Sequence, residues 1–396
     1  MKIAYFTDTF LPRIDGIVST VHEHTQILTT MGHEVIIYAP TYPGFDKNQN
    51  INNVVIKRQP SIPFPAYKGT RIPFPKTFKI YQSLVKLDPD VIHIHTPGPI
   101  GLMGILISKV LKKPLVGTYH TLFSETLVYA SPNELFKKLG IKIPNKKTFE
   151  NQKIGLFFKK LTWETVNKIY SNCNLVLAPS LPIKKLLIEQ GFKKNIRVLP
   201  SGIDTRLFST GKNIHKHSLK ILHVGRISYE KNVDVVLKAF QIVLNSLPSA
   251  QLIIAGDGPA LEDMKKLSKK LGIYKNIEFI GFINRINLPK LYKTADVFVT
   301  ASTMETLGLV VLEAMSCGLP IVAVNKYALP WIVKNNQNGF IVKPFDKIVM
   351  SEKIIQILKD KTTAKKFKKK SVEIAHKYEV QKIIRKLELI YQNLQK

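Results

Sequence analysis

Cysteines and long apolar segments are scarce in this sequence of 396 residues. The two cysteines, Cys173 and Cys317, lie far apart, so they provide no disulfide framework and fit a reducing compartment. No uncharged apolar stretch reaches the roughly 18 residues that a membrane-spanning helix needs. The opening residues MKIAYFTDTF lack the apolar segment of a signal peptide. These absences predict a cytoplasmic protein without a transmembrane helix.

Acidic residues are also few: 28 Asp and Glu stand against 59 Lys and Arg, which gives a net charge of +31. The excess is spread over both halves of the chain, as a compositional bias of a whole proteome would produce. An anionic membrane surface, nucleic acid or a phosphorylated substrate would also explain it. Because no zinc-ligand spacing or RNA-binding aromatic pattern is present, we expect no nucleic-acid partner.

Short apolar strands alternate with helical segments through most of the chain. The strand KIAYF precedes a helical stretch and the strand EVIIYA, and the pattern restarts after Ser201 with KILHVG and QLIIAG. This alternation predicts the α/β class, with two doubly wound Rossmann-like domains facing a cleft. We expect the N-terminal domain over residues 1–202 and the C-terminal domain over residues 203–376. Residues 377–396 are expected to form a helix that crosses back to the N-terminal domain.

Ligands of such sheets bind beyond the carboxyl ends of the strands. Arg226 and Lys231 follow the strand KILHVG, and cations near a helix start bind phosphate. Two ordinary surface cations with no ligand would give the same sequence pattern. Gly16 lies where a loop enters a helix, which also suggests an anion site. His120 follows the strand in PLVGTYH. A lone glycine is weak evidence, and a lone histidine is more often structural, but the position of His120 at the end of a strand favours a functional role.

Two glutamates bracket the apolar run in TMETLGLVVLEAMSCGLP. A buried carboxylate costs free energy unless it is paired, so an ordinary core helix leaves Glu305 and Glu313 unexplained. If the helix begins around Leu307 and Gly308, the amides of these residues and of Leu309 could hold a diphosphate. Glu305 could then reach a sugar, and Glu313 could accept hydrogen bonds from a ribose.

Metal-binding patterns are weak. The sequence DPD at 88–90 precedes the strand VIHIH, so it falls at the wrong end of a sheet for a catalytic metal. His93 and His95 share one face of that strand, but no carboxylate or cysteine partner is evident. We therefore expect no metal and no cofactor.

Together these segments resemble glycosyltransferase family 4, whose members are retaining enzymes of the GT-B fold. The resemblance rests on TFLPRIDGIVST, PDVIHIHTPGPIG, GTYHT, PSGIDT, VGRISYEKN, AGDGP, ADVFVTASTMETLGLVVLEAMSCGLPIVA and NGFIV. It implies that the C-terminal domain binds a nucleotide sugar and that the N-terminal domain holds the acceptor. It also implies that Arg226 and Lys231 bind the donor diphosphate, Glu313 the ribose and Glu305 the transferred sugar.

The resemblance implies further roles in the first domain and at the nucleobase. The backbone near Ile283 would read the base, and Gly16 and His120 would line the reacting centre, where His120 and Glu305 are the catalytic candidates. Many members carry Gly-Gly where this chain has Asp15-Gly16. The family chemistry favours front-face transfer without a covalent enzyme intermediate, in which the leaving phosphate helps to take the acceptor proton.

Within the family, TDTFLPRIDGIVST, GTYHTLF and IPFPAYKGTRIPFPK are most similar to the 1,2-diacylglycerol 3-glucosyltransferase branch. The branch implies glucose transfer from UDP-glucose to diacylglycerol by a peripheral enzyme on the inner face of the cell membrane. GDP-mannose-dependent mannosyltransferases that act on phosphatidylinositol or another glycan or lipid are an alternative. A nucleotide-sugar epimerase and a catalytically silent scaffold are others. The two glutamates with seven residues between them argue against the epimerase, and the presence of all the donor-site residues argues against the scaffold.

A lipid acceptor requires a surface that meets an anionic membrane. The candidate stretch from about Pro132 to Lys168 mixes lysines with large apolar side chains, which suits an interfacial helix. An ordinary core-packing helix with solvated lysines is the alternative, and KKFKKK in the second domain is a competing site. The docking residues that we single out are Lys137, Lys138, Phe157, Phe158, Lys159 and Lys160.

Overall fold

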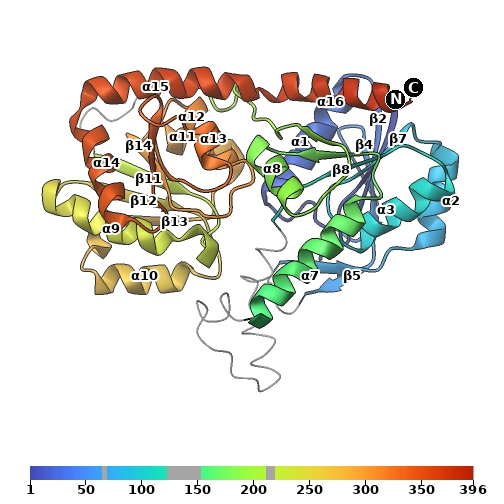
Figure 1. The fold of residues 1–396 in the computed structure, drawn as a ribbon, viewed down its shortest axis with the longest axis horizontal. Helices are drawn as coiled ribbons and strands as arrows, with labels where there is room; N and C mark the ends of the chain where they lie inside the picture. Colours follow the sequence, from blue (N-terminus) through green and yellow to red (C-terminus); the bar gives the residue numbers. More distant parts are fainter. Residues whose placement is uncertain (65–68, 123–152, 211–218, 396) are drawn as a thin grey trace. The chain divides into compact units, whose positions relative to one another are not determined.

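The computed structural model describes residues 1–64, 69–122, 153–210 and 219–395. The chain divides into two compact units (Figure 1). Unit 1 consists of Met1–Pro200 together with Gln381–Lys396, and unit 2 consists of Ser201–Val380. The C-terminal segment therefore belongs to the same unit as the N-terminus.

The core of unit 1 is an eight-stranded sheet with the order β10-β9-β8-β7-β1-β2-β4-β3. Neighbouring strands are parallel except for β3 and β4. Its strands are β1 (Lys2–Phe6), β2 (Glu34–Pro40), β3 (Gln49–Ile51), β4 (Val54–Gln59), β7 (Val91–Ile94), β8 (Leu115–Thr118), β9 (Leu175–Ala178) and β10 (Ile196–Val198). The inner strands are buried along nearly their whole length because helices cover both faces of a parallel sheet.

Short strands and helices complete unit 1. The antiparallel pair β5 (Ser61–Pro63) and β6 (Arg71–Pro73) stands apart from the main sheet. The helices are α1 (Gly16–Thr30), α2 (Thr77–Leu87), α3 (Pro99–Val110), α7 (Lys153–Tyr170), α8 (Leu181–Glu189) and α16 (Val380–Gln395). Side-chain caps set two of the starts: Asp15 accepts from the amide of Val18, and Ser180 accepts from that of Ile183.

Helix α16 supplies part of the core of unit 1. Leu387 and Tyr391 on one of its faces are fully buried, while Leu389 is exposed. The Tyr391 hydroxyl lies 3.0 Å from that of Tyr5 on β1. The last helix thus closes a core whose first strand lies at the other end of the chain.

Unit 2 has a six-stranded sheet in which every neighbouring pair is parallel, with the order β13-β12-β11-β14-β15-β16. Its strands are β11 (Lys220–Val224), β12 (Gln251–Ala255), β13 (Ile277–Gly281), β14 (Val297–Thr300), β15 (Ile321–Val324) and β16 (Gly339–Val342). The first strand of this unit along the chain, β11, lies in the middle of the sheet. The strands that follow it are added on one side as far as β13, and from β14 onward they are added on the other side, so the order reverses between β11 and β14. Unit 1 reverses in the same way between β1 and β7. Such switch points are where doubly wound sheets bind ligands.

Helices of unit 2 cover both faces of this sheet (Figure 1). In α9, the residues Val233, Val236, Leu237, Phe240 and Val243 are all buried, as their helical spacing predicts. The helices are α9 (Val233–Ser246), α10 (Leu261–Lys270), α11 (Leu288–Tyr292), α12 (Leu309–Ser316), α13 (Leu329–Ile332), α14 (Lys347–Lys359) and α15 (Lys361–Ala375). Short 3-10 helices are η1 (Tyr229–Lys231), η2 (Tyr274–Asn276), η3 (Arg285–Asn287) and η4 (His376–Tyr378). The strand orders confirm the predicted α/β class with two Rossmann-like units.

No helix among the described residues is both long and apolar enough to span a bilayer.

Candidate functional site

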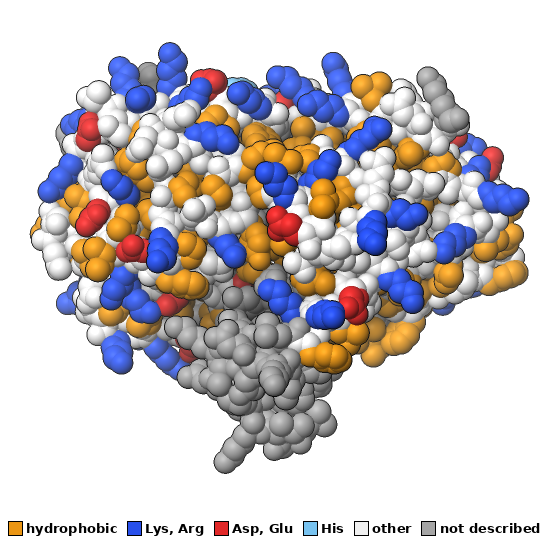
Figure 2. All heavy atoms as spheres, in the orientation of Figure 1, with side chains coloured by type: hydrophobic (Ala, Val, Ile, Leu, Met, Phe, Trp, Pro, Cys, Tyr) orange, Lys and Arg blue, Asp and Glu red, His pale blue; other side chains and the backbone are white. Residues whose placement is uncertain are grey.

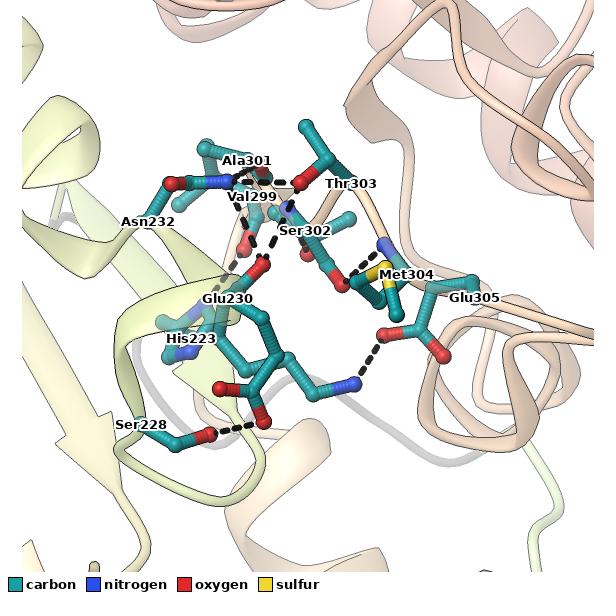
Figure 3. A network of polar contacts seen from close by, with 12 residues as sticks. His223, Ser228, Glu230, Asn232, Val299, Ala301, Ser302, Thr303, Met304 and Glu305 are labelled. Carbon is teal, nitrogen blue, oxygen red and sulfur yellow. Dashed lines mark hydrogen bonds and ion pairs between the residues drawn. The ribbon is translucent and has the colours of Figure 1, made fainter. Parts of the chain in front are cut away.

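An ion pair joins the two loops that flank the switch point of unit 2. Lys231 follows β11 and Glu305 follows β14, and Lys231 Nζ lies 2.6 Å from Glu305 Oε1 (Figure 3). The two side chains are 22% and 14% exposed, so the pair is partly shielded from water. These residues were predicted as site residues because each follows a strand, and the structure brings them together.

Asn232 fixes the backbone around this pair. Its Nδ2 donates to the carbonyl of Ala301 at 3.1 Å and to Thr303 Oγ1 at 3.1 Å, which ties the loop after β11 to the loop after β14 (Figure 3). Asn232 has a φ of 48°, a left-handed conformation that asparagine adopts more readily than most residues. The sequence reading did not select Asn232, although it adjoins Lys231 in the segment YEKN.

Glu305 is ionised at neutral pH. Burial alone would raise the pKa of its carboxyl group, but the charge of Lys231 and hydrogen bonds from Lys231 and Ser302 outweigh that effect and hold the pKa below its ordinary value. A carboxylate in this state accepts hydrogen bonds and does not serve as a general acid.

A neutral histidine lies behind the ion pair. His223 on β11 is buried, and its Nδ1 donates to the carbonyl of Val299 on β14 at 3.0 Å (Figure 3). Burial lowers the pKa of His223 to about 4. Only the lone histidine in KILHVG hints at this residue, and the sequence reading missed it.

Glu313 is buried on α12 with two partners of its own. Its Oε1 lies 3.3 Å from Arg285 Nε, and its Oε2 accepts from the Tyr292 hydroxyl at 3.1 Å. The argument that an ordinary helix leaves both glutamates unexplained is therefore wrong, because Lys231 pairs with Glu305 and Arg285 pairs with Glu313. Neither Arg285 nor Tyr292 was selected from the sequence.

Helix α12 begins at Leu309, slightly later than predicted. Gly308 precedes it with a φ of 85°, and a Cβ atom there would approach the Ile332 side chain to 3.1 Å, so glycine suits the position. Leu307 is buried. Within the described part of the chain, the amides of Leu307, Gly308 and Leu309 donate no hydrogen bond to another protein group. The predicted use of these amides for a diphosphate stays a prediction.

Arg226 and Ile283 lie at the same edge of the sheet as the ion pair. Arg226 follows β11 and Ile283 follows β13, and both are half buried. Glycines let the loops at this edge approach closely, because a Cβ atom on Gly256 would meet the carbonyl oxygen of Gly225 at 1.8 Å. The predicted phosphate and base residues thus gather at the carboxyl edge of one sheet.

The start of α1 in unit 1 is capped by an acidic side chain. Gly16 is the first helical residue, and the Asp15 carboxylate accepts from the amide of Val18 at 2.9 Å. Arg13 Nε pairs with the same carboxylate at 2.8 Å. The positive charge of Arg13 offsets that of the Asp15 carboxylate at this helix start, and the predicted role of Gly16 beside an anion stays a prediction.

Histidines cluster where β7 and β8 end in unit 1. His95 Nδ1 lies 3.0 Å from His120 Nε2. His93 is hydrogen-bonded through Nδ1 to Tyr391 Oη at 2.5 Å and through Nε2 to Thr118 Oγ1 at 2.7 Å. Burial lowers the pKa of His93, His95 and His120, so all three are neutral at pH 7. His120 was predicted from its place after β8, whereas its contact with His95 was not.

The predicted docking stretch is only partly described. Lys137 and Lys138 lie outside the described residues, as does the side chain of Phe158. On α7, Phe157 and Lys160 are exposed and Lys159 is half exposed. The Nζ atom of Lys160 lies 3.9 Å from Oε1 of Glu164.

The competing stretch KKFKKK lies in α15, where Phe367 is buried in the core of unit 2. Figure 2 shows Lys and Arg side chains scattered over the visible face with hydrophobic side chains between them. The basic charge on that face is therefore not gathered over one element.

Among the described residues, no group of three or more His, Cys, Asp and Glu side chains is placed to hold an ion. Asp88 pairs with Lys113 at 2.7 Å, and Asp90 accepts from the amide of Lys2. Both aspartates lie at the amino end of β7, away from the ligand edge, as the sequence predicted.

Comparison with known proteins assigns the fold to a family. The model of Glycosyltransferase Family 4 matches residues 14–207, and that of Glycosyl transferases group 1 matches residues 205–373. An alpha-monoglucosyldiacylglycerol synthase of Streptococcus pneumoniae is 32% identical over 338 residues, which are 82% of this chain and 71% of that protein. The chain belongs to glycosyltransferase family 4.

Other relatives and the solved structure of a similar protein agree with the assignment. The alpha-monoglucosyldiacylglycerol synthase of Acholeplasma laidlawii is 29% identical and covers 88% of this chain and 86% of its own length. A sulfoquinovosyl transferase of Arabidopsis thaliana is 29% identical over 92% of this chain and 68% of its own. Anabaena HepE, solved with UDP-glucose, has a TM-score of 0.78 at 19% identity and covers 99% of this chain and all of its own. These neighbours confirm the GT-B fold class.

Proposed function

We propose that this glycosyltransferase moves glucose from UDP-glucose to 1,2-diacylglycerol with retention of the anomeric configuration. The observation that carries the proposal is the Lys231–Glu305 pair at the switch point of unit 2. It is supported by the likeness of the chain to two alpha-monoglucosyldiacylglycerol synthases. No metal or other cofactor takes part in the proposed reaction.

The proposed donor site divides its work between charges and neutral groups. Lys231 donates to Glu305 and, with a second proton, to a phosphate oxygen of the donor, and Arg226 binds the same diphosphate. The glucose hydroxyl groups donate to the ionised Glu305 carboxylate. The amides of Leu307, Gly308 and Leu309 bind the diphosphate, Glu313 binds the ribose, and the backbone near Ile283 contacts the base.

In the proposed reaction, the bond between the anomeric carbon and the UDP oxygen breaks while the acceptor oxygen bonds to the same face of the sugar. The acceptor proton passes to the departing phosphate. Lys231 and Arg226 stabilise the charge that develops on that phosphate, and fixed charges of this kind supply much of the rate in transfer reactions. Gly16 and His120 are proposed to line the reacting centre. Glu305 forms no covalent bond, because it holds the sugar hydroxyl groups.

A transfer assay tests the proposal. Radiolabelled UDP-glucose is incubated with the protein and vesicles that contain diacylglycerol, and the lipid product is analysed by NMR for its anomeric configuration. We expect α-linked glucosyldiacylglycerol, and we expect Glu305→Gln to impair transfer while UDP affinity stays nearly unchanged. GDP-mannose with phosphatidylinositol is the matched alternative pair. Transfer from GDP-mannose alone, or no lipid product, would refute the proposed substrates.

We further propose that the enzyme docks on anionic membranes through the stretch that contains α7. Lysines near such a surface contribute about 1 kcal/mol each, and salt screens them. We expect sedimentation with anionic vesicles, and less with zwitterionic ones. Charge reversal of Lys137, Lys138, Lys159 and Lys160 should weaken binding more than reversal of the lysines in KKFKKK. Equal binding to neutral vesicles would contradict this docking mode.

A further inference from the structure

His95 lies between a buried network and the proposed reacting centre. It directly follows β7 and is 1% exposed. One face of its ring stacks on His93, with centroids 4.1 Å apart and planes at 28°. Its edge contacts His120 through the Nδ1–Nε2 distance of 3.0 Å. Both ring contacts restrict how His95 can turn.

The contact between His95 and His120 is a well-aligned hydrogen bond. Their ring centroids are 5.3 Å apart and the planes differ by only 22°. Two imidazoles whose nitrogens are 3.0 Å apart reach that centroid separation only when they meet edge to edge, with the N–H and the lone pair on one line. Linear geometry is the most favourable for a hydrogen bond. One of the two nitrogens must therefore carry the proton.

The other nitrogen of His95 decides which one carries it. His95 Nε2 is buried and has no hydrogen-bond partner among the described residues. A neutral imidazole carries one proton, so a proton on Nε2 would leave a buried N–H without an acceptor. Orphaned buried N–H groups are rarer in proteins than under-used acceptors. The proton of His95 therefore belongs on Nδ1, where His120 accepts it.

We propose that His95 is a positioning residue that donates from Nδ1 to His120 Nε2 and thereby holds the proton of His120 on Nδ1. The lone pair of His120 Nε2 is then occupied and the proton lies on Nδ1, so the Nδ1 of His120 is a hydrogen-bond donor and not a base. A sugar oxygen fits such a donor. This consequence for transfer rests on the proposed function, in which His120 lines the reacting centre.

Nuclear magnetic resonance tests the proton positions without an activity assay. The protein is labelled with ¹⁵N-histidine, and two-bond ¹⁵N–¹H correlations report which ring nitrogen is protonated. The His120 signals are assigned from their loss in His120→Gln. We expect His95 and His120 both to be protonated at Nδ1. Protonation of His120 at Nε2 in the unaltered protein would overturn the proposal.

Variants of His95 test its role. His95→Leu removes the donor, and His120 should then exchange between both tautomers. In His95→Asn the amide can donate from nearly the same place as Nδ1, so the His120 tautomer should be kept. A matched control is His33→Gln, since His33 is also buried in unit 1 but bonds Glu388 at 3.0 Å, and it should leave the His120 signals unchanged. An unchanged His120 tautomer in His95→Leu would contradict the positioning role.

Kinetics separate this proposal from the function on which it rests. His95→Leu should lower kcat for glucosyl transfer by about tenfold, the effect of losing one good hydrogen bond, with a smaller change in the KM for UDP-glucose. His95→Asn should restore most of the rate. Equal losses of rate in the two variants would show a packing role only and would refute the proposal. If the unaltered enzyme transfers no glucose, the proposed function fails, while the tautomer measurement still decides the role of His95.

Discussion

In unit 2 the loops at the switch point are joined by charges, Lys231 and Glu305, whereas in unit 1 the residues after β7 and β8 are joined by neutral histidines, His95 and His120. The strand order reverses in the same way in both sheets. The two units therefore share a strand topology but carry different chemistry at the carboxyl ends of their strands. An ion pair suits a phosphorylated ligand, and neutral imidazoles suit hydrogen bonding to uncharged groups.

The two units also differ in what completes their cores. Unit 1 needs α16 from the far end of the chain, with Tyr391 in contact with Tyr5 and His93. Unit 2 is built from one continuous segment, Ser201–Val380. The chain carries two tryptophans, Trp163 in unit 1 and Trp331 in unit 2. Fluorescence of Trp331→Phe and of Trp163→Phe therefore follows the unfolding of each unit separately.

The largest expected effect is that of a substitution that removes part of the packing of α16 in unit 1. Leu387→Ala deletes a fully buried side chain and should lower the free energy of unfolding of unit 1 by about 2–5 kcal/mol. The matched control is Leu389→Ala on the same helix, which is 57% exposed and should change it by less than about 0.5 kcal/mol. The measurement is urea unfolding followed by Trp163. An equal shift of the Trp331 transition would break the distinction between the units.

The second-largest expected effect is that of acid on the stability of the two units. Burial lowers the pKa of three histidines in unit 1, His93, His95 and His120, and of His223 in unit 2. The unfolded chain therefore binds more protons than the folded one below about pH 6.5. Stability is then full above that pH and falls as the pH is lowered, by about 1.4 kcal/mol per pH unit for each such histidine. For His223 the fall continues to about pH 4.

Unit 1 should therefore lose stability about three times as steeply as unit 2 between pH 6.5 and 5. Urea unfolding of the two single-tryptophan variants across this range gives both slopes. The variant His93→Gln tests this more directly, because it should reduce the slope of the free energy of unfolding against pH in unit 1 alone. Equal slopes in the two units would mean that the histidines of unit 1 are not held neutral.

A third prediction concerns the charges of unit 2. Lys231→Ala should weaken UDP binding by about 1.5–3 kcal/mol, since a hydrogen bond from a cation to a phosphate is lost. Lys238→Ala is a matched control, because Lys238 also forms an ion pair, with Asp234 at 2.8 Å, but lies along α9. Isothermal titration with UDP measures both. Unchanged UDP affinity in Lys231→Ala would remove this residue from the donor site.

The sequence predicted the fold class, and it selected Lys231 and Glu305 as separate candidate site residues, because both inferences follow from local patterns. The pairing of these two residues with each other was not predicted. Apolar strands mark the sheets, and residues directly after parallel strands share one edge. The partners of Glu313 could not be predicted in this way, since Arg285 and Tyr292 come from η3 and α11, which no pattern ties to α12. The capping role of Asp15 was missed because Gly16 alone was read as the helix entrance.

The contact between His95 and His120 was hidden for a different reason. It depends on β7 and β8 being neighbours in the sheet, and the sequence does not state the strand order. Tyr391 shows the same limit over a longer distance, because an amphipathic last helix does not reveal which core it completes. Local chemistry was therefore readable, whereas pairing across elements needed the structure.

The smallest expected effect is that of metal removal, which tests whether the charged residues of unit 2 bind the donor without a metal ion. Two cations, Arg226 and Lys231, follow β11 and can neutralise a diphosphate without an ion. EDTA should therefore leave UDP affinity and transfer unchanged within error. The control adds Mg²⁺ or Mn²⁺ back after dialysis, and neither should raise the rate. Loss of transfer in EDTA that Mg²⁺ restores would show that the positive charge of Arg226 and Lys231 is insufficient and that a divalent ion completes the donor site.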